Sequence, residues 1–210
     1  MSAHAATGGS VPAPTPDAGR FGMWIFLATE VLFFGGLLTA YAYGRIQWPD
    51  GFGVASRHTD VLLGTLNTGV LLTSSAVVAL AVACAESTSH RRWTGWLLYA
   101  AAALGLAFLG IKGLEYAQDW HEGLFPGPAF ELAGTAGAEL FYMLYYLMTA
   151  LHALHLAIGV ATLTVFGAGC RRGRPWANAH RIDIAALYWH FVDIVWIVLY
   201  PLLYLVNRHA

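Results

Sequence analysis

Charged residues are scarce in this sequence. Only 11% of its 210 residues are Asp, Glu, Lys or Arg, whereas about 25% is usual for a soluble domain. Hydrophobic residues make up 58% of the chain, and this balance indicates an integral membrane protein. The net charge of -1 gives no argument for nucleic-acid binding.

Basic residues are missing from the first 19 positions. Residues 1–19 are rich in Ala, Pro, Gly and Ser and have no period that would bury a face, so we expect a disordered tail. The stretch also lacks the basic start of a secretion signal. The apolar segment after Arg20 is too long for a signal core and is expected to be retained.

Long apolar runs define the fold. A helix needs about 20 mostly apolar residues to cross about 30 Å of hydrocarbon. Five such runs are predicted, at residues 21–44, 61–85, 93–116, 138–167 and 184–206. We therefore expect an all-α integral membrane protein in which residues 20–210 form one five-helix domain.

The arginines predict the orientation of these helices. The N-terminal side carries seven of them, and the opposite side carries three, Arg45, Arg57 and Arg208. Basic loops stay in the cytoplasm, so the N-terminus is predicted inside and the C-terminus outside. Cys84 and Cys170 then lie near cytoplasmic helix ends, where thiols stay reduced, and indicate neither a disulfide nor a metal site. The seven arginines are Arg20, Arg91, Arg92, Arg171, Arg172, Arg174 and Arg181.

One carboxylate falls in the middle of the first span. Glu30 lies roughly 14 Å from the cytoplasmic end at 1.5 Å per residue. A charged carboxylate at that depth costs roughly 2.5–3.5 kcal/mol, so we expect a neutral acid that donates a hydrogen bond. Two interpretations stay open: an acid that handles protons, and a structural hydrogen bond that fixes helix packing.

The second and third spans carry polar and small residues that favour helix contacts in lipid. In the second span these include Asn67 and Ser74, which share a face. Lys112 and Glu115, three residues apart near the outer end of the third span, predict a local ion pair or snorkelling. The small residues of the third span that allow a neighbour to approach are Ala101, Gly105, Gly110 and Gly113.

The last two spans contain histidines, but their depths argue against haem. His190 is roughly 10 Å from the cytoplasmic end, whereas His155 and His152 are roughly 18 and 23 Å from it. No Cys or carboxylate joins the two neighbouring histidines to complete a metal site, so hydrogen-bonding roles are expected. Glu30 and Asp193 have similar depths, roughly 14 Å, and are predicted to belong to one buried polar cluster.

Five motifs, in this order and spacing, resemble subunit III of the haem–copper terminal oxidases. They are GMWIFLATEVLFFGGLL (22–38), LNTGVLLTSS (66–75), LEY (114–116), LHALHLAIG (151–159) and YWHFVDIVWIVLY (188–200). The resemblance covers residues 21–206, and the last motif is highly specific.

The resemblance implies a non-catalytic subunit of a cytochrome c oxidase of the aa or caa type in a bacterial plasma membrane. Such an oxidase reduces oxygen to water and pumps protons. In this family subunit III holds no redox centre, and haem and copper lie in subunits I and II. Its implied roles are to bind phospholipid in a cleft, to stabilise subunit I and to support proton uptake.

The resemblance also assigns residues. Glu30 matches the family's carbodiimide-reactive carboxylate, and Asp183 stands where many members have Glu. With His190 and Asp193, these two are predicted as buried polar residues related to proton uptake. Seven further matches are predicted to be structural or to contact lipid: Asn67, Glu115, His152, His155, Tyr188, Trp189 and Trp196.

The electron donor stays open at this point. The mitochondrial form of the family has seven helices and this chain has the last five, which is also usual in bacterial quinol oxidases. Glu at position 30 favours cytochrome c as the donor. The alternatives are subunit III of a quinol oxidase, an accessory subunit of nitric oxide reductase and a freestanding proton carrier, although no broken helix or inverted repeat favours the carrier.

Overall fold

The computed structural model describes residues 16–87, 91–128 and 130–205. In these residues, five helical spans are long and apolar enough to cross a membrane. The predicted all-α membrane fold is therefore confirmed, while the orientation in the membrane stays a prediction. The elements are α1 (Pro16–Gln47), α2 (Pro49–His58), α3 (Val61–Ala85), α4 (Arg91–His121), α5 (Ala138–Arg171), α6 (Ala179–Tyr200) and the π-helix η2 (Pro201–Leu205).

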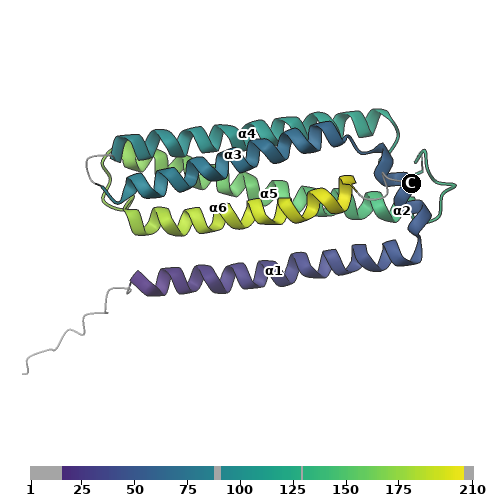
Figure 1. The fold of residues 1–210 in the computed structure, drawn as a ribbon, viewed down its shortest axis with the longest axis horizontal. Coiled ribbons are helices and arrows are strands. Elements are labelled where there is room, and N and C mark those ends of the chain that lie inside the picture. The colour runs from purple at the N-terminus through teal and green to yellow at the C-terminus, as the bar shows by residue number, and fades with distance from the viewer. Residues whose placement is uncertain (1–15, 88–90, 129, 206–210) are drawn as a thin grey trace, which may run out of the picture.

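Four of the helices form a bundle and the first one flanks it. α3 packs against α4 and α6, and α5 completes the bundle between α4 and α6, while α1 runs along α6 and α5 (Figure 1). The short α2 lies at one end, which we call the α2 end (Figure 1). The opposite end holds the start of α1 and the turns from α3 to α4 and from α5 to α6, and we call it the arginine end.

The predicted spans are right in number but mostly too short. α3 occupies the predicted 61–85, whereas α4 continues to His121 and α5 to Arg171. The last span begins earlier than predicted, at Ala179. Apolar runs mark only the part of a helix that lies in hydrocarbon, so polar turns that continue the helix beyond it are missed.

The predicted N-terminal tail overlaps the first helix. α1 begins at Pro16, so residues 16–19 are helical and not part of a disordered segment. Proline fits the first helical turn because its missing N–H would have no intrahelical partner there. Residues 1–15, the remainder of the predicted tail, lie outside the described part of the chain.

The helix α2 is absent from the sequence prediction. Its glycines and Pro49 are typical of a loop, but packing outweighs this local preference. The centroid of the Phe52 ring lies 5.3 Å from that of the Tyr41 ring and 5.5 Å from that of the Phe141 ring. A Cβ atom at Gly51 would come 2.0 Å from the carbonyl oxygen of Ala136, so glycine is required for this close approach.

The bundle closes around the side chain of Trp189, which is fully buried. A Cβ atom at Gly105 on α4 would come 2.7 Å from the indole ring, and one at Gly159 on α5 would come 2.9 Å from it. The two glycines therefore form the slot for Trp189. Gly105 thus serves close packing as expected, whereas Gly110 and Gly113 have no neighbour within 4 Å of a built Cβ.

This slot predicts that two glycines on the same helix respond differently to alanine. Gly105→Ala should lower the thermal stability of the purified chain in detergent, by about 1–3 kcal/mol, because the methyl group overpacks against Trp189. Gly110→Ala should leave stability unchanged or raise it by up to about 1 kcal/mol through helix propensity. Thermal unfolding followed by circular dichroism measures both variants, and equal melting temperatures would contradict the slot.

Candidate functional site

The polar residues of the spans form separate groups along the bundle. One group surrounds Lys112 near the α2 end. A second joins Glu30 on α1 to His155 on α5, and a third contains His190 on α6. The hydrogen-bond partners of each side chain determine what chemistry that side chain can perform.

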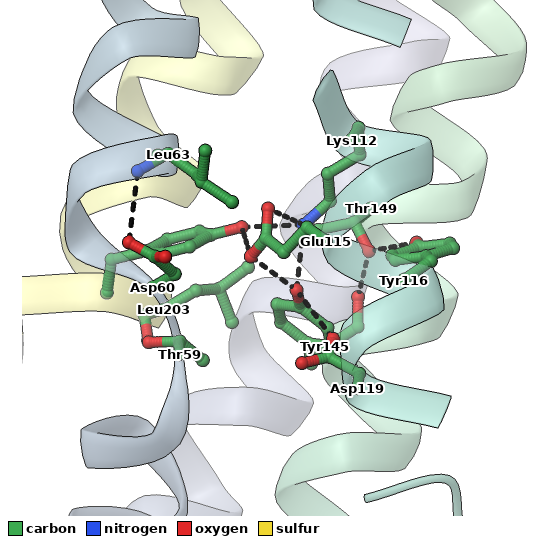
Figure 2. Close-up of polar contacts among 12 residues, drawn as sticks. Thr59, Asp60, Leu63, Lys112, Glu115, Tyr116, Asp119, Tyr145, Thr149 and Leu203 are labelled. Atoms are coloured by element: carbon green, nitrogen blue, oxygen red, sulfur yellow. Dashed lines mark hydrogen bonds and ion pairs between the residues drawn. The ribbon is translucent and has the colours of Figure 1, made fainter. Parts of the chain in front are cut away.

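The Lys112 group is a closed network of hydrogen bonds (Figure 2). The Lys112 ammonium donates to Glu115 Oε2 at 3.1 Å, to the Tyr145 hydroxyl at 2.8 Å and to the Tyr204 hydroxyl at 2.6 Å. An ammonium has three N–H donors, so all of them are used. The two hydroxyls in turn donate to Glu115 Oε1, at 2.8 and 2.6 Å.

Several elements build this network. Lys112, Glu115 and Asp119 come from one face of α4, and Tyr145 comes from α5 (Figure 2). Tyr204 comes from η2. The π-helix begins at Pro201, which lacks the N–H that would continue the α-helical pattern. The widened turn that follows places Tyr204 against the ammonium.

The Lys112–Glu115 ion pair expected from the sequence is confirmed. The alternative, in which the Lys112 side chain snorkels to the membrane surface, is wrong. Both side chains are only 3% exposed. Aromatic rings surround the ammonium, with the centroid of Tyr145 at 4.5 Å and that of Tyr204 at 5.3 Å. These cation–π contacts replace part of the lost hydration, so the charge stays inside the bundle and does not reach for the lipid surface.

The second group fastens α1 to the bundle. Glu30 Oε2 lies 3.1 Å from His155 Nε2, and their side chains are 18% and 14% exposed. His155 Nδ1 lies 2.8 Å from the carbonyl oxygen of Leu151, and the Tyr188 hydroxyl donates to the backbone oxygen of His155 at 2.9 Å. Leu151 at Nδ1 and Glu30 at Nε2 therefore fix the orientation of the imidazole ring, and its Nε2 edge faces α1.

This geometry restricts where the protons of the pair reside. A carbonyl oxygen only accepts, so His155 Nδ1 carries a proton. Nε2 then either accepts a hydrogen bond from a protonated Glu30 or donates one to a Glu30 carboxylate. The two forms hold the same number of protons and differ by the transfer of one proton along the 3.1 Å contact. The pair can therefore exchange a proton internally without changing its net charge.

Two further polar contacts hold α1, one near each end. The Arg20 guanidinium pairs with Asp183 on α6 at the arginine end. The Tyr41 hydroxyl donates to the carbonyl oxygen of Leu202 at 2.5 Å near the α2 end. Asp183 is 28% exposed, so its predicted burial is wrong, because this residue lies in the first turns of α6 beside an arginine that reaches across from α1.

The third group lies between α6 and α3. His190 Nδ1 is 2.7 Å from the Ser75 hydroxyl, and Asp193 one turn later is only 3% exposed. Both Asp193 carboxylate oxygens are buried without a hydrogen-bond partner among the described residues, whereas Glu30 pairs with His155 on α5. The prediction that Glu30 and Asp193 share a cluster is therefore wrong, because equal depth does not imply that two residues face each other.

The remaining predicted residues lie in the packed interior. His152 is 1% exposed and lies between Phe108, which it meets edge-on, and Trp196, against which it is tilted, with ring centroids 5.6 and 5.1 Å away. Among the described residues its ring nitrogens have no hydrogen-bond partner, and neither does the fully buried amide of Asn67. The Trp196 indole N–H donates to Thr68 at 3.1 Å. These side chains therefore contribute to helix packing.

The histidines do not converge on a metal position. His155 points to α1, His152 lies among aromatic rings and His190 faces Ser75. In the described residues, no cluster of three or more His, Cys, Asp or Glu side chains has the geometry to hold a metal ion.

Two apolar grooves flank the line along which α1 meets α6. The first, about 440 Å³, is lined by Phe26, Ile158 and Tyr188 and has Arg181 at the arginine end. The second, about 630 Å³, is lined by Trp24, Leu32 and Ile194 among others. Since α1 touches the bundle along a narrow strip, grooves remain on both of its sides.

The sequence interpretation missed Asp119, Tyr204 and the role of Lys112 in a shared network. A signal was present, because Lys112, Glu115 and Asp119 are three and four residues apart and share one helix face. Asp119 Oδ2 lies 3.3 Å from the Tyr145 hydroxyl, as a more distant acceptor for the one proton that this hydroxyl donates to Glu115. The contribution of Tyr204 depends on the π-helical turn, which the sequence pattern does not indicate.

Comparisons with known proteins agree with this architecture. A family described as Cytochrome c oxidase subunit III matches residues 2–207. A cytochrome c oxidase subunit 3 from Thermostichus vulcanus is 32% identical over 200 residues, covering 92% of this chain and 90% of that protein. A probable quinol oxidase subunit 3 from Staphylococcus epidermidis is 27% identical, and the alignment covers 91% of this chain and 90% of that protein. A heme-copper oxidase subunit I+III from Aeropyrum pernix is 31% identical and covers 90% of this chain but only 23% of its own length.

The closed network predicts strong coupling between Lys112 and Glu115. Lys112→Met should cost about 3–5 kcal/mol of stability, because Glu115 is left buried without a counter-ion. Adding Glu115→Gln should recover part of this loss, because the buried carboxylate is then neutral. Unfolding in mixed micelles measures the cycle, with Glu122→Gln at an exposed carboxylate as a control expected to stay within about 0.5 kcal/mol. A double variant that loses the sum of both single effects would contradict the coupling.

Proposed function

Because the chain belongs to the cytochrome c oxidase subunit III family, we propose that it serves as a non-catalytic subunit of an aa- or caa-type cytochrome c oxidase. In this role it stabilises the catalytic subunit, holds phospholipid and supports proton uptake while oxygen is reduced to water. The observation that carries the proposal is the arrangement of α1, which three polar contacts hold beside a self-contained bundle. Haem and copper belong to the partner subunits.

The proposed main contact is with oxidase subunit I. The relative from Aeropyrum pernix carries subunits I and III in one chain, which supports a close association of the two. The outer face of α1 is suited to such a contact, since Phe21, Ile25 and Phe33 line neither groove and are 67%, 52% and 47% exposed. Subunit II and cytochrome c complete the proposed assembly, in a bacterial plasma membrane.

The two grooves beside α1 are suited to phospholipid. Their walls are almost entirely apolar and accept acyl chains. Arg181 lines the end of the first groove that lies at the arginine end, where its guanidinium can pair with a headgroup phosphate. Lipid in these grooves would fill the space on both sides of the α1–α6 contact and so support the position of α1.

Proton uptake is assigned to Glu30 and His155. The pair holds a proton that moves between a carboxyl and an imidazole, and both side chains are partly exposed at the edge of the bundle. When this neutral pair passes a proton to a neighbouring chain its net charge becomes −1, and uptake of one proton from water makes the pair neutral again. Asp193 and His190 stay proposed as residues related to proton uptake. His190 bonds to Ser75 on α3, and the buried Asp193 carboxyl has no hydrogen-bond partner among the described residues.

A quinol oxidase is the second candidate complex. It is favoured by the similarity to the probable quinol oxidase subunit 3 of Staphylococcus epidermidis, which covers nearly the whole chain. The same subunit architecture serves either donor, because electrons enter through partner subunits. The haem spectrum and the donor oxidised by the purified complex distinguish the two.

The proposal is tested by purifying the tagged chain from its native membrane in mild detergent. We expect it to co-purify with a haem- and copper-containing subunit that oxidises cytochrome c and consumes oxygen. As a control, the tag placed on an unrelated membrane protein should recover no haem. If the tagged chain were recovered without any haem protein, the assignment would fail.

Two substitutions at Glu30 separate proton uptake from packing. Glu30→Gln keeps a neutral hydrogen-bond donor to His155 Nε2, so we expect the subunit to stay in the complex while oxygen consumption at high turnover falls. Glu30→Ala also removes the contact, which costs about 1 kcal/mol, and should weaken retention of the chain. Oxygen consumption and subunit content measure both effects. Normal turnover of the Gln variant would leave a purely structural role for Glu30.

A further inference from the structure

A separate polar cavity lies at the arginine end, where α4 begins and α5 ends. Its volume is about 380 Å³, and its lining includes Arg92 and Trp96 from α4 and Arg171 and Arg172 from the last residues of α5 and its cap. It shares no lining residue with either groove beside α1. It is therefore a different site from the proposed lipid grooves.

One guanidinium of this cavity is held in place by the protein. The Arg171 guanidinium lies 4.2 Å from the centroid of the Trp96 ring and 5.9 Å from that of Tyr99. Its stem passes over Gly95, where a Cβ atom would come 2.7 Å from Arg171 Cγ. The charged group is thus oriented in advance, which lowers the entropy cost of binding a ligand.

The cavity concentrates positive charge without a carboxylate to balance it. In the residues that the structure describes, the three ion pairs involve other side chains, and none includes Arg92, Arg171 or Arg172. Guanidinium groups bind phosphate through two parallel hydrogen bonds. Basic pockets between membrane helices are suited to anionic lipid headgroups for this reason.

Two tryptophans place the cavity at the level of lipid headgroups. Trp93 and Trp96, in the first turns of α4, are 66% and 55% exposed. Tryptophan is enriched where hydrocarbon meets the polar headgroup layer. A free anion needs no such position, whereas a lipid phosphate lies at this depth with its acyl chains running along the apolar helix surface.

A second cavity adjoins the first. It has a volume of about 320 Å³, and Arg172 and Ala168 line both cavities. Arg174 and Trp176 line its other side. The turn that carries them is pinned to α4, because the Arg91 guanidinium donates to the backbone oxygens of Arg174 and Ala177. Arg172 thus stands between two cavities, each with a further arginine.

We propose that these joined cavities bind the headgroup of an anionic phospholipid with two phosphates, of the diphosphatidylglycerol class. One phosphate binds at Arg92 and Arg171, the other binds at Arg174, and Arg172 lies between them. This lipid would tie the start of α4 to the end of α5 and to the turn that follows. The proposal goes beyond the α1 grooves, and it requires only that the chain lies in a membrane.

The test is native mass spectrometry of the chain, isolated with its native partners and stripped of lipid. Tetraoleoyl-diphosphatidylglycerol, dioleoyl-phosphatidylglycerol and dioleoyl-phosphatidylcholine are added separately. We expect the first to bind most tightly, and Arg171→Gln with Arg172→Gln to weaken its binding roughly tenfold or more. Arg92 is exposed and lies on α4, and Arg92→Gln should also weaken binding of this lipid. This single variant tests the site even if the double variant assembles poorly.

Controls separate this site from other sources of binding. Arg45→Gln, near the opposite end of α1, should leave diphosphatidylglycerol binding unchanged. The proposal is overturned if the cavity variants bind this lipid as tightly as the unaltered chain does, or if phosphatidylcholine binds equally well. It is also overturned if inorganic phosphate at the same concentration displaces the lipid, since the site would then be one for a free anion.

Discussion

The hydrogen bond between Glu30 and His155 fixes the position of α1 against the bundle, and the grooves beside α1 depend on that position. It is the contact that holds α1 to the bundle between the Arg20–Asp183 pair and the Tyr41 hydroxyl, at the ends of the helix. In hydrocarbon a polar contact of this kind has no water to compete with it. α1 is therefore fixed in position although little of its surface is buried, and the two apolar grooves exist because it is fixed there.

The bundle supplies the rigid support that this arrangement needs. Trp189 fits a slot made by Gly105 and Gly159, so α4, α5 and α6 approach closely and in one register. At the α2 end, the Lys112 network ties α4 and α5 to the C-terminal turn. The Lys112 network satisfies its ammonium donors, whereas the buried indole N–H of Trp189 has no hydrogen-bond partner among the described residues. Contacts with other chains are proposed for α1 and for the ends of the helices.

Most of the fold could be predicted from the sequence, because five long apolar runs admit little else in a chain so poor in charge. The approach of Gly105 to a neighbour and the Lys112–Glu115 pair followed from residue type and helical spacing. The pairing of Glu30 with His155, not Asp193, could not, because depth along a helix says nothing of its rotation. α2 and the π-turn that delivers Tyr204 depend on packing that overrides local preference.

Polar groups of similar chemistry have different properties in this protein, because their hydrogen-bond partners differ. In the Lys112 network every ammonium donor has an acceptor inside the protein, so a further ligand would have to displace an existing bond. The Glu30–His155 pair is satisfied in two protonation arrangements, so it can pass a proton without losing its contact. The Arg171 guanidinium is positioned over Trp96, and neither Arg171 nor Arg172 forms an ion pair with a carboxylate among the described residues. The closed network is therefore suited to holding structure, and the proposals of proton transfer and lipid binding concern the two groups whose partners are not fixed in one arrangement.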